Sequence, residues 1–114
     1  LMNNPKAQKI LNSLIKEAGG EWKPESVCEQ LTQLRTIALE MNDPLIVKTL
    51  RLMREKIQED ESFEVEIEVL DEEDEFEEPE NHLEYLLNLL LESDNKYNRE
   101  EIKLYRTALM KELY

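Results

Sequence analysis

The chain has 114 residues, with 27 Asp and Glu against 14 Lys and Arg, which gives a net charge of -13. This charge disfavours nucleic acid and anionic membranes as general partners, because both would repel it. The single cysteine, Cys28, excludes an internal disulfide and a cysteine-based metal site, and it favours a reducing, cytoplasmic location. The length predicts a single domain over residues 1–114.

Three amphipathic helices are predicted in the first half of the chain. Their expected ranges are about 5–18, 24–41 and 44–58. Each starts at a proline (Pro5, Pro24 or Pro44), which is tolerated at the first helical position because its missing N–H would have no partner there. Apolar residues then recur at spacings of three and four, as on one face of a helix. The short connections predict that these helices pack antiparallel.

The next stretch, residues 57–95, holds 17 of the 27 acidic residues and no Lys or Arg. Within it, apolar and acidic residues alternate strictly from residue 63 to residue 69. A period of two predicts a β-strand with one apolar and one anionic face, because successive side chains of a strand point to opposite sides. The apolar face consists of Phe63, Val65, Ile67 and Val69, and the anionic face of Glu64, Glu66 and Glu68.

A lone strand leaves its backbone donors and acceptors unpaired, and no second alternating run occurs in the chain. The partner could be the same strand of a second copy, a short return strand near Phe76, or the sheet edge of another protein. Repulsion between facing glutamates weakens the first alternative. Pairing between copies and a local hairpin rank equally, ahead of another protein's sheet edge, and we expect a homodimer.

Eight of the ten residues from Asp71 to Glu80 are acidic. A run of this composition cannot bury enough apolar surface to offset the cost of ordering it, so a mobile acidic loop is predicted. The acidic strand and loop together span residues 59–80. Calcium and magnesium prefer carboxylate oxygens, but a defined calcium loop normally needs a glycine for its tight turn, and residues 57–95 contain none.

Two more helices are expected, over about residues 81–93 and 99–113. The first is apolar nearly all round, because Tyr85 and Leu89 lie off its main leucine face, which is typical of a central helix or one shared with another chain. Asn98 and Glu101 have the spacing of a capping box at the start of the second. The predicted fold is mainly α, a five-helix bundle of antiparallel helical hairpins with one short acidic β-strand-like insert between helices three and four.

The sequence predicts no enzyme and no cofactor or metal site. His82, the only histidine, is expected to be exposed among acidic residues, and Pro79 stands where a helical Glu-x-x-His pair would need a glutamate. Cys28 lies beside apolar positions and is expected to be a buried structural thiol. A glycine-rich phosphate loop and a Ser/His/Asp set are both absent from the sequence.

The expected function is protein binding by a regulatory or assembly subunit that presents its acidic segment to a basic partner surface. Electrostatic steering would bring the partner in, and apolar side chains would hold it. The expected partner-binding residues are Phe63, Glu64, Val65, Glu66, Ile67, Glu68, Val69, Asp71, Glu72, Glu73, Asp74, Glu75 and Phe76. Two alternatives stay open: a nucleic-acid-mimicking inhibitor of a DNA-binding protein, and a purely structural oligomerisation module.

Overall fold

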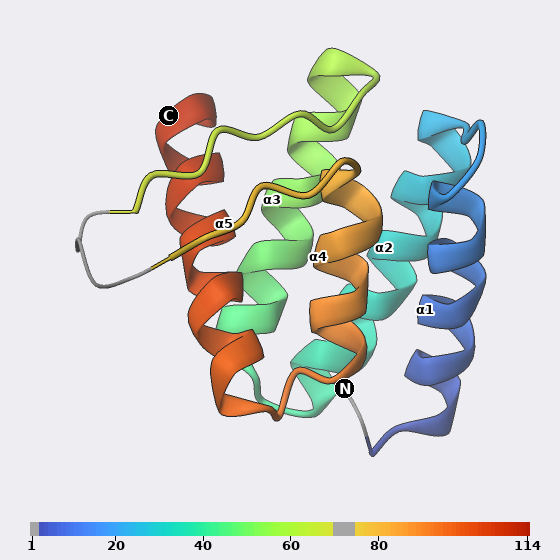
Figure 1. Ribbon diagram of the computed structural model, residues 1–114. Helices are drawn as coiled ribbons and strands as arrows, with labels where there is room; N and C mark the ends of the chain where they lie inside the picture. The colour runs from blue at the N-terminus through green and yellow to red at the C-terminus, as the bar shows by residue number, and fades with distance from the viewer. Residues whose placement is uncertain (1–2, 70–74) are drawn as a thin grey trace.

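The computed structural model describes residues 3–69 and 75–114 of the chain. Five α-helices occur in these residues: α1 (Pro5–Ala18), α2 (Pro24–Glu40), α3 (Pro44–Asp60), α4 (His82–Leu91) and α5 (Lys96–Leu113). Consecutive helices run in opposite directions (Figure 1). The prediction of a mainly helical bundle is therefore confirmed.

Asparagine and aspartate side chains begin four of the helices, because a carboxyl or amide oxygen accepts from a backbone N–H that has no partner inside the helix. The caps are Asn4 for α1, Asp43 for α3, Asn81 for α4 and Asn95 for α5. The predicted capping box at Asn98 is wrong. The side chain of Asn95 already accepts from the backbone N–H of Asn98 at 3.1 Å, so α5 starts three residues earlier than expected.

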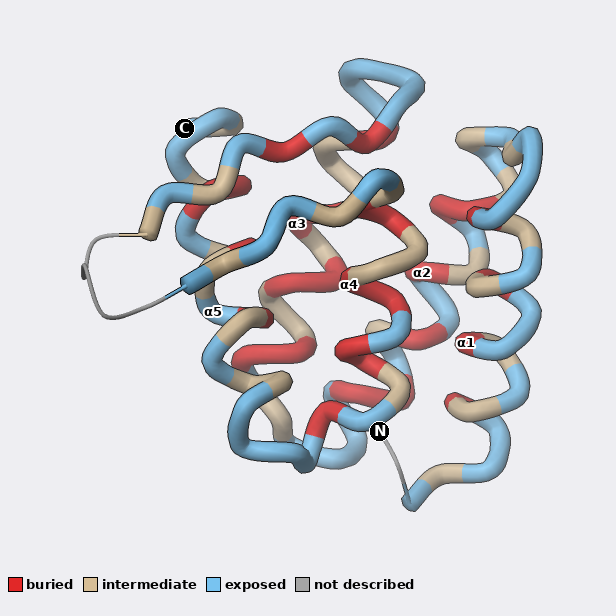
Figure 2. Tube along the Cα trace, viewed as in Figure 1, coloured by how far each residue is buried: buried red, intermediate tan, exposed pale blue. Residues whose placement is uncertain are grey.

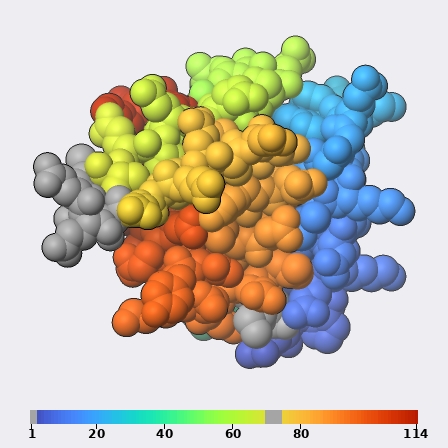
Figure 3. Space-filling view, viewed as in Figure 1, coloured from blue at the N-terminus to red at the C-terminus, as the bar shows by residue number. Residues whose placement is uncertain are grey.

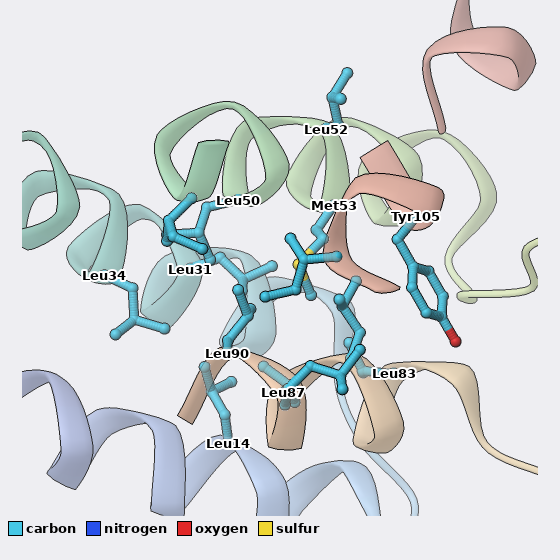
Figure 4. Close-up of a cluster of buried hydrophobic side chains, with 14 of the residues drawn as sticks. Leu14, Leu31, Leu34, Leu50, Leu52, Met53, Leu83, Leu87, Leu90 and Tyr105 are labelled. Atoms are coloured by element: carbon cyan, nitrogen blue, oxygen red, sulfur yellow. The ribbon is translucent and has the colours of Figure 1, made fainter. Parts of the chain in front are cut away.

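The five helices form a closed ring around one core. α1 contacts α2 and α4, α3 contacts α2 and α5, and α4 also contacts α5. Figure 2 shows buried residues along the inner side of every helix, and in Figure 4 leucines of α1, α2 and α4 point into the same space. On α4, Leu86, Leu87 and Leu90 are fully buried and Leu89 is nearly so. Helices of the same chain therefore account for the apolar circumference of α4.

The predicted strand at residues 63–69 is wrong, because the described residues contain no β-strand. Phe63 and Val65 are nevertheless buried, Ile67 is half-buried, and Glu64 and Glu66 are exposed. Alternation of apolar and acidic residues indicates an extended chain with one apolar and one acidic side, and it does not require a neighbouring strand. Here the helical core accepts the apolar side chains, so this extended segment needs no sheet.

Contacts with α5 hold the extended segment, which crosses the C-terminal end of that helix in Figure 1. The backbone N–H of Glu66 donates to the Glu112 carboxylate at 3.1 Å, and Lys111 forms an ion pair with Glu68. The chain returns through residues 75–81, which are also irregular. The predicted acidic loop lies partly outside the described residues, while at its end Phe76 is half-buried against Tyr85 and Tyr105.

Asp43 joins the start of α3 to α5. Its carboxylate accepts from Ile46 N–H at 3.4 Å and from both terminal nitrogens of Arg99, at 2.9 and 3.0 Å. The hydrogen bond from Arg99 is the main reason that the pKa of Asp43 is lowered. Asp43→Asn keeps a capping side chain and loses the ion pair, so we expect the free energy of unfolding at pH 7 to fall by about 1 kcal/mol.

The pH dependence of this loss has a definite sign. A carboxyl with a lowered folded-state pKa stabilises the protein above its unfolded pKa of about 3.9, and the stabilisation fades as pH falls through the folded pKa. The difference between the natural chain and Asp43→Asn should therefore be constant near neutral pH and shrink below about pH 4. Urea unfolding at several pH values measures it; an equal difference at pH 3 and pH 7 would rule out this role for the ion pair.

Candidate partner-binding surface

A row of carboxylates lies on the outer side of the extended segment. Glu64, Glu66 and Glu68 are exposed, while Phe63 and Val65 are each 4% exposed and fix the segment to the core. Alternate residues of an extended chain point to the same side, so these three carboxylates form a row. The sequence correctly placed these acids on the side of the segment opposite the apolar residues.

The returning run, residues 75–81, lies on the same face of the molecule as the extended segment (Figure 3). Glu75, Glu77 and Glu78 are exposed there. We call six of the exposed acids of the two runs the acidic surface; its members are Glu64, Glu66, Glu68, Glu75, Glu77 and Glu78. Among them, only Glu68 pairs with a Lys or Arg of the described chain. The acidic surface therefore carries a net negative charge, which the Lys111 ammonium near Glu68 and Glu66 offsets only in part.

A pocket of about 250 Å³ lies between the two runs. We call it the acidic pocket; its lining residues are Glu66, Ile67, Val69, Phe76, Glu78 and His82. One carboxylate comes from each run, and the apolar side chains are all half-buried. The pocket therefore combines apolar walls with negative charge.

His82 is buried, with 5% of its surface exposed, so the prediction of an exposed histidine is wrong. Its Nδ1 lies 2.7 Å from the hydroxyl of Tyr105, and its Nε2 lies 3.3 Å from a carboxylate oxygen of Glu78. One tautomer satisfies both contacts: the hydroxyl donates to Nδ1, and Nε2–H donates to Glu78. The sequence did not show this, because Tyr105 comes from the facing helix, 23 residues away.

Four aromatic rings pack together at the acidic pocket, and two of them, those of Phe76 and His82, line it. The ring of Phe76 lies 6.0 Å from those of both Tyr85 and Tyr105, and the His82 ring lies 5.7 Å from that of Tyr105. Burial raises the pKa of Tyr105, and burial with a hydrogen bond to Glu101 raises the pKa of Tyr85 to about 12. Both phenols therefore keep their protons at neutral pH and act as hydrogen-bond donors.

The predicted partner-binding residues divide into three groups. Phe63 and Val65 belong to the core, whereas Ile67, Val69 and Phe76 are half-buried at the surface. The acids Glu64, Glu66, Glu68 and Glu75 are exposed. The remaining four predicted residues, Asp71, Glu72, Glu73 and Asp74, lie outside the described part of the chain. Glu77 and Glu78 belong to the predicted acidic segment, although the list of partner-binding residues ends at Phe76. The sequence did not indicate the aromatic support from Tyr85 and Tyr105.

Cys28 is buried, as predicted, and its thiol contacts the backbone oxygen of Arg54 at 3.8 Å. Burial raises the pKa of the thiol. A second pocket, of about 480 Å³, lies between α2 and α3 beside this cysteine. A raised pKa leaves the group as a thiol at neutral pH, which fits a packing role rather than a nucleophile.

In the described ranges, His, Cys, Asp and Glu side chains form no group of three that could hold a metal ion. Of the helices in those ranges, none is both long and apolar enough to cross a membrane. No protein family, curated protein sequence or solved structure that was compared with this chain matches it. The function is therefore inferred from the residues themselves.

Proposed function

We propose that this chain is a non-enzymatic protein-binding subunit, regulatory or assembling, that presents the acidic surface to a basic surface of its partner. The observation that carries this proposal is the exposure of carboxylates, most of which form no ion pair with Lys or Arg, on a segment that is anchored in the core. Glu64 and Glu66 are exposed, whereas Phe63 and Val65 between and beside them are buried. A solvating tail would need no such anchoring.

Anchoring favours binding for two reasons. Carboxylates that are held near one another repel, and a cationic partner relieves that repulsion while steering the encounter. The extended segment is also already ordered by its buried side chains and by the bond from Glu66 N–H to Glu112. Binding would then lose less conformational entropy than the capture of a disordered acidic tail.

The apolar part of the contact differs from the one expected at first. Phe63 and Val65 are already packed into the protein core. Any apolar contact with the partner therefore falls to the half-buried side chains of Ile67, Val69 and Phe76. All three line the acidic pocket, next to Glu66 and Glu78.

The test compares the binding of deca-arginine by the natural chain and by a variant with Glu64, Glu66, Glu75 and Glu77 changed to Gln. We expect the variant to bind about 30-fold more weakly, from roughly 0.5 kcal/mol for each exposed charge pair. The affinity of the natural chain should fall as salt rises, because salt screens exposed charges. Isothermal titration calorimetry measures both effects.

A matched control separates position from net charge. Glu21, Glu25, Glu29 and Glu40 are exposed residues of the α1–α2 connection and α2, and none forms an ion pair in the described chain. Changing these four to Gln alters the net charge equally, and we expect at most a small loss of affinity. Equal losses in the two variants would mean that only net charge matters, and the proposal would fail.

The row of Glu64, Glu66 and Glu68 also supports the second candidate, a nucleic-acid mimic that blocks a DNA-binding protein. Mimicry requires carboxylates at fixed positions, and the buried side chains of Phe63 and Val65 supply that fixation. The two candidate functions differ in whether the partner itself binds DNA. Duplex DNA should compete with this chain for the partner under mimicry and should have no effect on a partner that does not bind DNA.

The homodimer, the structural oligomerisation module and the cytoplasmic location stay predictions. Two observations had favoured self-association, an unpaired strand and an apolar helix. In the structure, the core accepts Phe63 and Val65, and helices of the same chain surround α4. Light scattering at several salt concentrations tests the dimer: a mass of 13.6 kDa throughout would exclude it, and twice that mass would support it.

A further inference from the structure

The acidic pocket has the size and lining of a site for one side chain. Pockets that hold a whole small molecule usually measure about 300–1,000 Å³, whereas this one measures about 250 Å³. Ile67, Val69 and Phe76 provide apolar wall, and Glu66 and Glu78 provide negative charge from its two sides. No Lys or Arg of the described chain forms an ion pair with either carboxylate.

We propose that the acidic pocket receives an arginine side chain of the basic partner, an inference that rests on the proposed function. The guanidinium group is planar, always charged, and has five donors that suit carboxylates. Its aliphatic stem can lie against apolar side chains, here Ile67 and Val69, and its cation is attracted by an aromatic ring such as that of Phe76. The lining supplies each of these contacts.

The lining favours arginine over the other cations that an acidic site could take. A lysine ammonium is compact and strongly hydrated, so it gains less from the Phe76 wall. A divalent ion needs several oxygen ligands at short range, whereas the described part of the pocket brings no three metal-ligating side chains together. Of these cations, arginine makes the fullest use of both the apolar and the charged parts of the lining.

The walls are held in place before binding. The Phe76 ring packs against Tyr85 and Tyr105, and the His82 ring is fixed by the Tyr105 hydroxyl at 2.7 Å. His82 in turn lies 3.3 Å from Glu78, which orients one of the two carboxylates. A pocket whose side chains are already ordered loses little entropy when it is filled.

The test is an NMR titration of the full chain with N-acetyl-arginine methylamide. We expect saturable shifts of the Ile67 methyl, Phe76 ring and His82 ring resonances, with weak affinity because the probe is one residue. The citrulline derivative, which has nearly the same shape and no charge, should bind at least about tenfold more weakly. The lysine derivative should bind more weakly than the arginine derivative. An equal response to citrulline, or to magnesium chloride, would overturn the proposal.

Variants locate the site. Phe76→Leu should weaken arginine binding roughly two- to fivefold through loss of the cation–π contact. Glu66→Gln should also weaken it, and this exposed substitution leaves the packing intact. Glu29→Gln is the matched control, since Glu29 is also exposed but lies on α2, outside both the acidic surface and the acidic pocket. Equal effects of Glu29→Gln and Glu66→Gln would show that the probe responds to net charge and does not occupy the pocket.

The two proposals can fail separately. If deca-arginine binding depends on the acidic surface while the single-residue probe gives no saturable shift, the arginine pocket is wrong and the proposed function stands. If neither probe binds, both proposals are wrong.

Discussion

Replacing Leu87 with alanine is expected to lower the free energy of unfolding by about 3–5 kcal/mol. Leu87 is fully buried, and its helix, α4, contacts both α1 and α5. The substitution removes apolar contacts and leaves a cavity that a ring of helices closed on all sides cannot fill by collapse. Urea unfolding followed by circular dichroism measures the loss.

Leu39 provides the control for this prediction. It lies on α2 and is 51% exposed, so Leu39→Ala should change the free energy of unfolding by no more than about 0.5 kcal/mol. If Leu87→Ala were as mild as Leu39→Ala, α4 would not lie inside the bundle. Its apolar circumference would then have to be covered by a second copy.

Replacing Phe63 with alanine should lower the free energy of unfolding by about 3 kcal/mol or more. A loss of this size is expected for a buried phenylalanine, whether it lies in a helix or in an irregular segment. Phe63 is 4% exposed although it belongs to an irregular segment. Its neighbour Glu64 is exposed, and Glu64→Ala should stay within about 0.5 kcal/mol.

This comparison tests how the acidic surface is held. If the apolar residues of the extended segment were free and waiting for a strand of a partner, Phe63→Ala would cost almost nothing in the isolated chain. A large loss for Phe63→Ala beside a small one for Glu64→Ala means that the core anchors the row of glutamates. Both variants are measured by urea unfolding at one salt concentration, so that charge repulsion is screened equally.

The helices could be predicted from the sequence because their signals are local. Pro5, Pro24 and Pro44 stand at the first positions of α1, α2 and α3, and all three starts were predicted correctly. The start of α5 was predicted wrongly, because two asparagines compete for the cap and Asn95 comes first. Local patterns identify a helix more securely than they identify which of two capping residues begins it.

The strand and the histidine were predicted wrongly for a different reason. Alternation from Phe63 to Val69 shows which side chains face inward, and it does not show whether a helix or a strand lies beneath them. His82 has acidic neighbours in sequence, yet its hydroxyl partner, Tyr105, comes from α5. Both properties depend on which distant residues the fold brings close.

Only the acidic composition of the candidate site could be predicted from the sequence. Excess acid in residues 57–95 located the acidic surface, since charge is read directly from the sequence. The acidic pocket could not be foreseen, because it lies between two irregular runs that the sequence pattern does not place side by side. Glu66 on one run and Glu78 on the other become neighbours of the same pocket only after the helices have packed.

Mapping deca-arginine on the natural chain by amide chemical shifts tests the central claim most directly. The account predicts saturable shifts that cluster in residues 63–69 and 75–81, with little change at the exposed acids Glu21, Glu29 and Glu40. Shifts spread evenly over the exposed acids of the whole molecule would contradict it, because they would show that the peptide responds to net charge and not to the acidic surface.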